Sequence, residues 1–125
     1  MDIYEEFIGK LSNDKLVDVC NQLREEILHY PNIEITKKFN LPFFYGKTWV
    51  CYLNLVKKRE IELAFVRGRE LPSKELLNFK ERVMIGGLTY KSVTNLDLGI
   101  LRLLLEEAIT LDQEKPYTFV KRKKK

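Results

Sequence analysis

The central part of the chain, residues 37–93, is dense in the β-branched and aromatic residues that favour strands. Glycine, proline and lysine clusters divide it into runs that predict four strands. These runs are residues 37–46, 48–57, 60–67 and 82–93. A sheet of this size needs one covered face, so the rest of the chain is expected to supply helices that cover it.

The flanking segments have helical spacing. Apolar residues recur on one side of residues 2–11, and a second helix begins at Ser12-Asn13-Asp14 and ends before Pro31. Thr94-Asn95 is expected to cap a leucine-rich last helix, whose apolar pattern ends near residue 111 and which places Leu101 and Leu105 near the core centre. The predicted fold class is α+β: a mostly antiparallel sheet of about four to five strands, with N-terminal helices and a C-terminal helix packed on it.

The alternation within the strands predicts which side chains face the core. In the second run the inward set is Trp49, Cys51, Leu53 and Leu55, and in the third it is Ile61, Leu63 and Phe65. Pro42 cannot donate a ladder hydrogen bond, which indicates an edge or bulged first strand over residues 33–46. Gly86-Gly87 indicates a bulge or a close backbone approach in the last strand.

Length and charge divide the chain into one domain, residues 1–111, and a basic tail, residues 112–125, expected to be flexible. Residues 121–125 carry five of the 22 lysines and arginines, so the remaining chain, with 17 basic and 18 acidic side chains, is close to neutral. A basic footprint over the whole domain is therefore missing, and contact with nucleic acid is expected only from the tail. The residues concerned are Lys121, Arg122, Lys123, Lys124 and Lys125.

The sequence predicts a cytoplasmic protein. The acidic start of the chain lacks the basic and apolar regions of a signal peptide, and no apolar run is long enough to span a bilayer. The two cysteines, Cys20 and Cys51, fall at apolar positions and are expected to be buried free thiols. A monomer or a homodimer is expected.

An ordered set of short motifs resembles the YdhG-like family of small bacterial proteins, a domain of unknown function. The similarity covers about residues 30–111, and it is carried by Lys38-Phe39-Asn40-Leu41-Pro42-Phe43-Phe44-Tyr45, Cys51-Tyr52-Leu53-Asn54, Phe65-Val66-Arg67-Gly68-Arg69-Glu70-Leu71, Leu76-Leu77 with Lys80 and Arg82, and Glu106-Glu107-Ala108-Ile109. Where the family usually has a glycine, this chain has Phe79. The resemblance implies helices on an antiparallel sheet, and no established catalytic residues come with it. Because some members are proposed to act like frataxins, it also implies an iron chaperone for iron–sulfur or heme assembly as an alternative function.

Aromatic density around one turn marks the best candidate for a binding site of a protein or small-molecule partner. Aromatic walls with a few convergent polar groups are what ligand sites need, although such a run also suits core and edge packing. The candidate residues are Lys38, Phe44, Tyr45, Trp49, Tyr52, Lys80 and Arg82. The three cations would provide an anion contact if the fold brings their loops together.

Catalysis and metal binding have weaker support. The single histidine, His29, ends a helix, and no nucleophile motif or phosphate loop is present, so the protein is expected not to be an enzyme and to need no cofactor. If iron is bound, its ligands would be Asp18, Glu25 and Glu26, which form a small acidic patch interrupted by bases.

Overall fold

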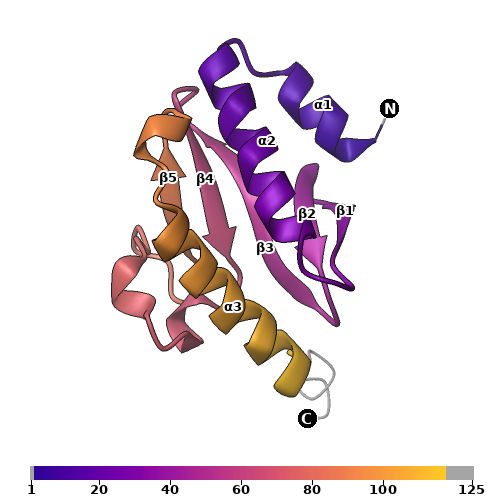
Figure 1. Ribbon diagram of the computed structural model, residues 1–125, viewed down its shortest axis with the longest axis vertical. Coiled ribbons are helices and arrows are strands. Elements are labelled where there is room, and N and C mark those ends of the chain that lie inside the picture. The colour runs from indigo at the N-terminus through magenta and orange to yellow at the C-terminus, as the bar shows by residue number, and fades with distance from the viewer. Residues whose placement is uncertain (1, 118–125) are drawn as a thin grey trace.

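The computed structural model describes residues 2–117, and its centre is a five-stranded antiparallel sheet in the order β1-β2-β3-β4-β5 (Figure 1). The order follows the chain, so each strand pairs with the one before it. The predicted α+β class is confirmed, with the strand number at the upper end of the expected range. The strands are β1 (Glu34–Lys38), β2 (Leu41–Tyr45), β3 (Trp49–Val56), β4 (Glu60–Phe65) and β5 (Gly86–Tyr90).

Three α-helices lie on one side of the sheet, as Figure 1 shows. They are α1 (Ile3–Gly9), α2 (Asp14–Leu28) and α3 (Leu98–Glu114). Asn13 caps α2, as the sequence indicated, because its side chain accepts a hydrogen bond from the backbone of Lys15. Short 3₁₀ turns at Gly68–Glu70, Lys74–Leu76 and Val93–Asn95 complete the connections.

The core lies between the helices and the side of the sheet that faces them. Ile61, Leu63 and Phe65 of β4 have no exposed surface and point into it, as their alternation predicted. Leu101 and Leu105 of α3 are also fully buried in the same cluster. The helix-facing side of the sheet therefore supplies the hydrophobic contact that holds the layers together.

The predicted first strand is in fact a hairpin of two strands. Phe39 and Asn40 both have positive φ, which gives the two-residue turn that antiparallel strands with a right-handed twist favour. Pro42 lies in β2 opposite Lys37, and β2 is not an edge strand. The proline is tolerated because the recorded pairing of β2 with β3 begins only at Phe43.

The segment before the last helix also differs from its prediction. Residues 93–95 form a 3₁₀ turn, and the side chain of Asp97 caps α3, rather than Thr94 or Asn95. The helix continues to Glu114, past the point where its apolar pattern ends. The predicted strand over residues 82–93 is shorter, because β5 includes only Gly86–Tyr90.

Within residues 2–117, none of the helices combines the length and the hydrophobicity needed to cross a bilayer.

Replacement of Leu105 by alanine tests the placement of α3. Because the side chain is fully buried, we expect the free energy of unfolding to fall by about 2–5 kcal/mol, from lost transfer energy and the cavity left behind. Leu103 of the same helix is 43% exposed, so Leu103→Ala is the matched control and should cost well under half as much. Urea unfolding measures both, and equal losses would contradict the observed orientation of α3.

Candidate functional site

The side of the sheet turned away from the helices carries the candidate site, and we call it the open face. In the register of the sheet, Phe43 of β2, Tyr52 of β3, Ala64 of β4 and Gly87 of β5 form one row on this face. Phe43 and Ala64 are buried but do not belong to the core cluster under the helices. Their burial therefore comes from other side chains of the open face, which makes this face a second, smaller packed layer.

Aromatic rings form one half of the open face. The rings of Phe43 and Tyr52 stack with centroids 4.5 Å apart, and Trp49 meets Phe43 edge-on at 5.5 Å and Tyr45 at 4.7 Å. Tyr45, Trp49 and Tyr52 are each half-buried. We call Phe43, Tyr45, Trp49 and Tyr52 the aromatic cluster. It presents tyrosine and tryptophan rings to solvent on a fixed base, which is the geometry of a contact surface.

Lysine and phenylalanine extend the aromatic cluster at its rim. The ammonium group of Lys38 lies 4.8 Å from the ring centroid of Trp49 and 4.8 Å from that of Phe39. Phe39, at the tip of the β1–β2 turn, is 78% exposed. A cation held against these rings by cation–π attraction gives the cluster a positive rim.

A register shift between Phe44 and Tyr45 explains why Trp49 belongs to this cluster. The sequence predicted that Trp49 points inward with Cys51 and Leu53, and this was wrong. The irregular pairing reverses the alternation at the start of β3, so that Val50 joins the core cluster while Trp49 contacts Phe43 and Tyr45.

The turn before Trp49 is held by a carboxylate from α3. Asp112 is buried, and its oxygens accept hydrogen bonds from the backbone nitrogens of Lys47, at 2.7 Å, and of Thr48, at 2.8 Å, and from the Thr48 hydroxyl. A side chain at Gly46 would collide with the same carboxylate, because a Cβ there would lie 2.5 Å from Asp112 Oδ2. Asp112 thus fixes the β2–β3 turn and, through it, the start of β3.

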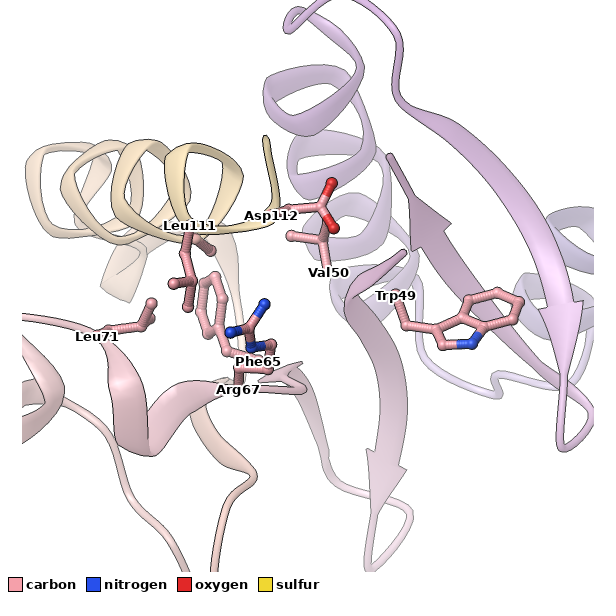
Figure 2. A pocket seen from close by; sticks show the side chains of 8 residues that line it. Trp49, Val50, Phe65, Arg67, Leu71, Leu111 and Asp112 are labelled. Atoms are coloured by element: carbon pink, nitrogen blue, oxygen red, sulfur yellow. The ribbon is translucent and has the colours of Figure 1, made fainter. Parts of the chain in front are cut away.

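The space beside this turn is too small to be a binding site. Figure 2 shows its lining residues, with Trp49 extending away from Phe65, Arg67 and Leu71. The cavity has a volume of about 10 Å³, which is room for one water molecule at most. This cavity is therefore not a ligand site.

A fully buried carboxylate, that of Glu62, lies at the centre of the open face. Arg82 Nη2 donates to Glu62 Oε2 at 2.6 Å, and Lys80 Nζ lies 3.8 Å from the same oxygen. Asn54 of β3 donates to the other oxygen at 3.5 Å. The pKa of the neighbouring Tyr52 hydroxyl is raised by burial, and the charge of Arg82 partly opposes this. The ion pair joins the 78–82 loop to the sheet and fixes both cations at the edge of the aromatic cluster.

Glycines make room for this arrangement. A Cβ on Gly87 would lie 2.2 Å from Glu62 Oε2, and a Cβ on Gly86 would lie 2.7 Å from the ring of Phe79. Phe79, the departure from the family pattern, therefore packs against Gly86, and the guanidinium of Arg69 covers its ring at 3.7 Å. The close backbone approach predicted for Gly86-Gly87 is confirmed.

A basic hollow of about 560 Å³ occupies the other end of the open face, beside the β3–β4 hairpin. Its lining residues are Val56, Lys57, Arg59, Glu60, Asn78, Lys80, Thr89 and Lys91. Four of the eight are cationic, and the one carboxylate, that of Glu60, lies 3.9 Å from Lys91 Nζ. This hollow has the charge and size to hold anionic groups of a ligand.

The structure thus brings six of the seven predicted site residues to one face. These are Lys38, Tyr45, Trp49, Tyr52, Lys80 and Arg82. Phe44 is separated from them, because it is fully buried on the helix-covered side. The predicted tail contact, residues 121–125, lies outside the described residues.

The predicted site residues did not include Glu62, Phe43, or Lys57, Arg59 and Lys91 of the basic hollow. A charged residue between two core positions reads as a solvent-facing residue, and only a glycine on the neighbouring strand, Gly87, two residues before its direct partner Thr89, indicates that a large side chain needs that space. The hollow is assembled from three segments, so no local pattern of residues indicates it.

The acids proposed as iron ligands are not gathered at one point. Asp18 and Glu25 are exposed on α2, and Glu26 accepts two hydrogen bonds from Arg102 of α3, at 2.8 and 3.0 Å. This pairing lowers the pKa of the Glu26 carboxyl. Across residues 2–117, no three side chains of the metal-binding types His, Cys, Asp and Glu come together.

The two cysteines and the histidine lie away from the open face. Cys20 and Cys51 are buried free thiols, as predicted, and burial raises the pKa of Cys20 to about 12 and that of Cys51 further. His29 is the C-terminal cap of α2, as the sequence indicated. A thiol with so high a pKa stays protonated at neutral pH and is a poor nucleophile.

No family model matches the chain, and no curated protein does. The three helices on one side of a five-stranded antiparallel sheet give the chain a YdhG-like fold, and the resemblance predicted from the sequence is confirmed at this level. A similar solved structure is the crystal structure of YdhG, a DUF1801-family protein from Bacillus subtilis, with a TM-score of 0.68. The alignment covers 94% of this chain and 95% of that chain at 16% sequence identity, so the likeness concerns the fold.

Arg82→Met tests whether the ion pair with Glu62 organises the open face. Removal of one partner leaves a buried charge, which typically costs about 3–5 kcal/mol. Because Lys80 remains and Arg82 itself is 27% exposed, we expect a loss of roughly 2–3 kcal/mol in urea unfolding.

The matched control is Arg59→Met, which removes an exposed arginine of the same face and should change the stability by less than about 0.5 kcal/mol. Similar effects of the two substitutions would show that the Glu62–Arg82 pair is no more important than an ordinary surface charge.

Proposed function

We propose that this protein is a non-catalytic binding module that takes its ligand on the open face. One observation carries the proposal: half-exposed Tyr45, Trp49 and Tyr52 gather on a face that no helix among residues 2–117 covers, with cations at its edges. Exposed aromatic surface next to fixed charges is typical of contact sites.

The cations beside the aromatic cluster indicate that the ligand carries negative charge. Lys38 lies at the rim of the aromatic cluster, and Lys80 and Arg82 are held beside it by Glu62. A ligand with flat or apolar groups and negative charge satisfies both kinds of contact. The surroundings of the cysteines and of His29 support the non-catalytic part of the proposal, because none of them lies on the open face.

The side chains of the site hold one another in place, which is consistent with this role. Phe43 is only 4% exposed under its neighbours, and Glu62 is fully paired. The rings and cations are therefore fixed before the ligand arrives, which reduces the entropy lost on binding.

Trp49, the only tryptophan of the chain, reports on the site by fluorescence. We expect its emission to change when a panel of nucleotides and anionic metabolites is titrated, and Tyr52→Ala to weaken the binding of the responding compound by about tenfold. Tyr30→Ala, on the helix side, is the matched control and should leave the affinity unchanged. Turnover of any compound would contradict the non-catalytic proposal.

Ferrous iron belongs in the same panel, because the iron-chaperone alternative uses other residues. Two results together would favour the iron-chaperone alternative. One is micromolar iron binding that disappears when Asp18, Glu25 and Glu26 are changed to their amides, and the other is the lack of any response of Trp49 to the compounds. The functional site would then lie on α2 and not on the open face.

A further inference from the structure

We infer that the open face binds single-stranded nucleic acid, with bases on the aromatic cluster and phosphates in the basic hollow. The inference rests on the proposed function, since it names the ligand class of the same face. Three features of the open face support it: the charge of the hollow, the exposure of the rings and the distance between the hollow and the rings.

The basic hollow provides the phosphate contacts. Lys57, Arg59, Lys80 and Lys91 surround a space of about 560 Å³. Within residues 2–117, Lys57 and Arg59 form no ion pair. The carboxylate contacts of Lys80 with Glu62, at 3.8 Å, and of Lys91 with Glu60, at 3.9 Å, are long. Cations without a close carboxylate keep their full charge for a ligand, and their contacts with the phosphates of a nucleic acid release the counterions condensed on it.

The aromatic cluster provides the stacking surface. Tyr52 and Trp49 are half-buried, and Phe39 is mostly exposed at the rim. Stacking on such rings tolerates any base, because every base has a π-face. Antiparallel sheets with outward aromatic rings are a known way of holding unstacked bases. A duplex keeps its bases stacked internally, so these rings select a single strand.

The two features lie on one continuous surface. On β3, Tyr52 belongs to the aromatic row, and Val56, four residues further on, lines the hollow. Four residues of a strand extend about 13 Å, which is longer than one nucleotide. Asn54 and Glu62, with Arg82, occupy the row between them. A nucleotide with a single phosphate is too short to use both ends, whereas a chain of several nucleotides reaches both.

The competing occupant is an acidic protein surface. Its carboxylates would satisfy the cations of the hollow, but acidic side chains have no extended flat face to stack on Trp49 and Tyr52. A single strand is a flexible chain that carries both flat bases and phosphates, so it contacts the aromatic cluster and the basic hollow at once. For this reason we prefer nucleic acid as the ligand.

Titration of a fluorescein-labelled oligothymidylate of about ten nucleotides, a length within the usual range for one small domain, tests the inference on the full chain. We expect the anisotropy of the label to rise and the emission of Trp49 to fall as a base stacks on it. With four cations in the hollow, the slope of log affinity against log salt should be about −3, at about −0.7 for each phosphate contact on a single strand. A duplex of the same length should bind several-fold more weakly.

Matched substitutions locate the contacts. The double variant Lys57→Gln, Lys91→Gln should reduce the steepness of the salt slope by about 1.4, because two phosphate contacts are lost. The double variant Lys10→Gln, Lys15→Gln makes the same change in net charge away from the open face, on and beside the first helices, and should leave the slope unchanged. Tyr52→Ala should weaken binding about tenfold, the loss expected for one stacked base. Both double variants should keep the urea midpoint of the parent protein.

The outcomes separate the possible failures. If binding disappears when Lys121, Arg122, Lys123, Lys124 and Lys125 are changed to glutamine, but is unaffected by Lys57→Gln, Lys91→Gln, the tail is the binding element and the inference is wrong. If the oligonucleotide does not bind but Trp49 responds to another compound of the panel, the inference fails and the proposed function stands. If Trp49 responds to nothing, both fail.

Discussion

The contact between the helices and one side of the sheet is the interaction on which the rest of the structure depends. Phe65, Leu101 and Leu105 lie in this layer without exposed surface, and apolar burial of this kind is the main favourable term in folding. Because all three helices are committed to one side, the opposite side keeps its tyrosines, its tryptophan and its cations near solvent. The open face is thus a consequence of how the core is built, and its rigidity comes from that core.

The ion pair of Glu62 and Arg82 gives the open face its order. A buried ion pair adds little net stability, because the desolvation of two charges offsets most of their attraction. Its structural effect is clearer: the carboxylate lies against Gly87 and holds Arg82 at 2.6 Å, so that the 78–82 loop has one position relative to β4. The pair fixes the side chain of Arg82 in a loop that the Asn78–Gly87 bridge also ties to β5.

Local patterns predicted much of this architecture, and the misses have physical causes. The alternation of Ile61, Leu63 and Phe65 identified the inward side of β4, because that strand pairs regularly on both sides. The same reasoning failed at Trp49, where the register shift reverses the alternation, and at Phe39-Asn40, where a tight turn forms without the usual glycine. Most of the predicted site residues do share one face, but the hollow that completes the site depends on tertiary contacts, which no single segment encodes.

The hydrogen bonds of Asp112 have a consequence for the order of events during synthesis. The turn at Gly46–Thr48 takes its partner from a residue 64 to 65 positions later in the chain. A ribosome, which adds about 5–20 residues per second, releases β2 and β3 well before it releases α3. The β3–β4 hairpin can close from its own residues, whereas the turn that orients Trp49 has to wait for the last helix. The turn beside the aromatic cluster is therefore completed only after α3 has been synthesised.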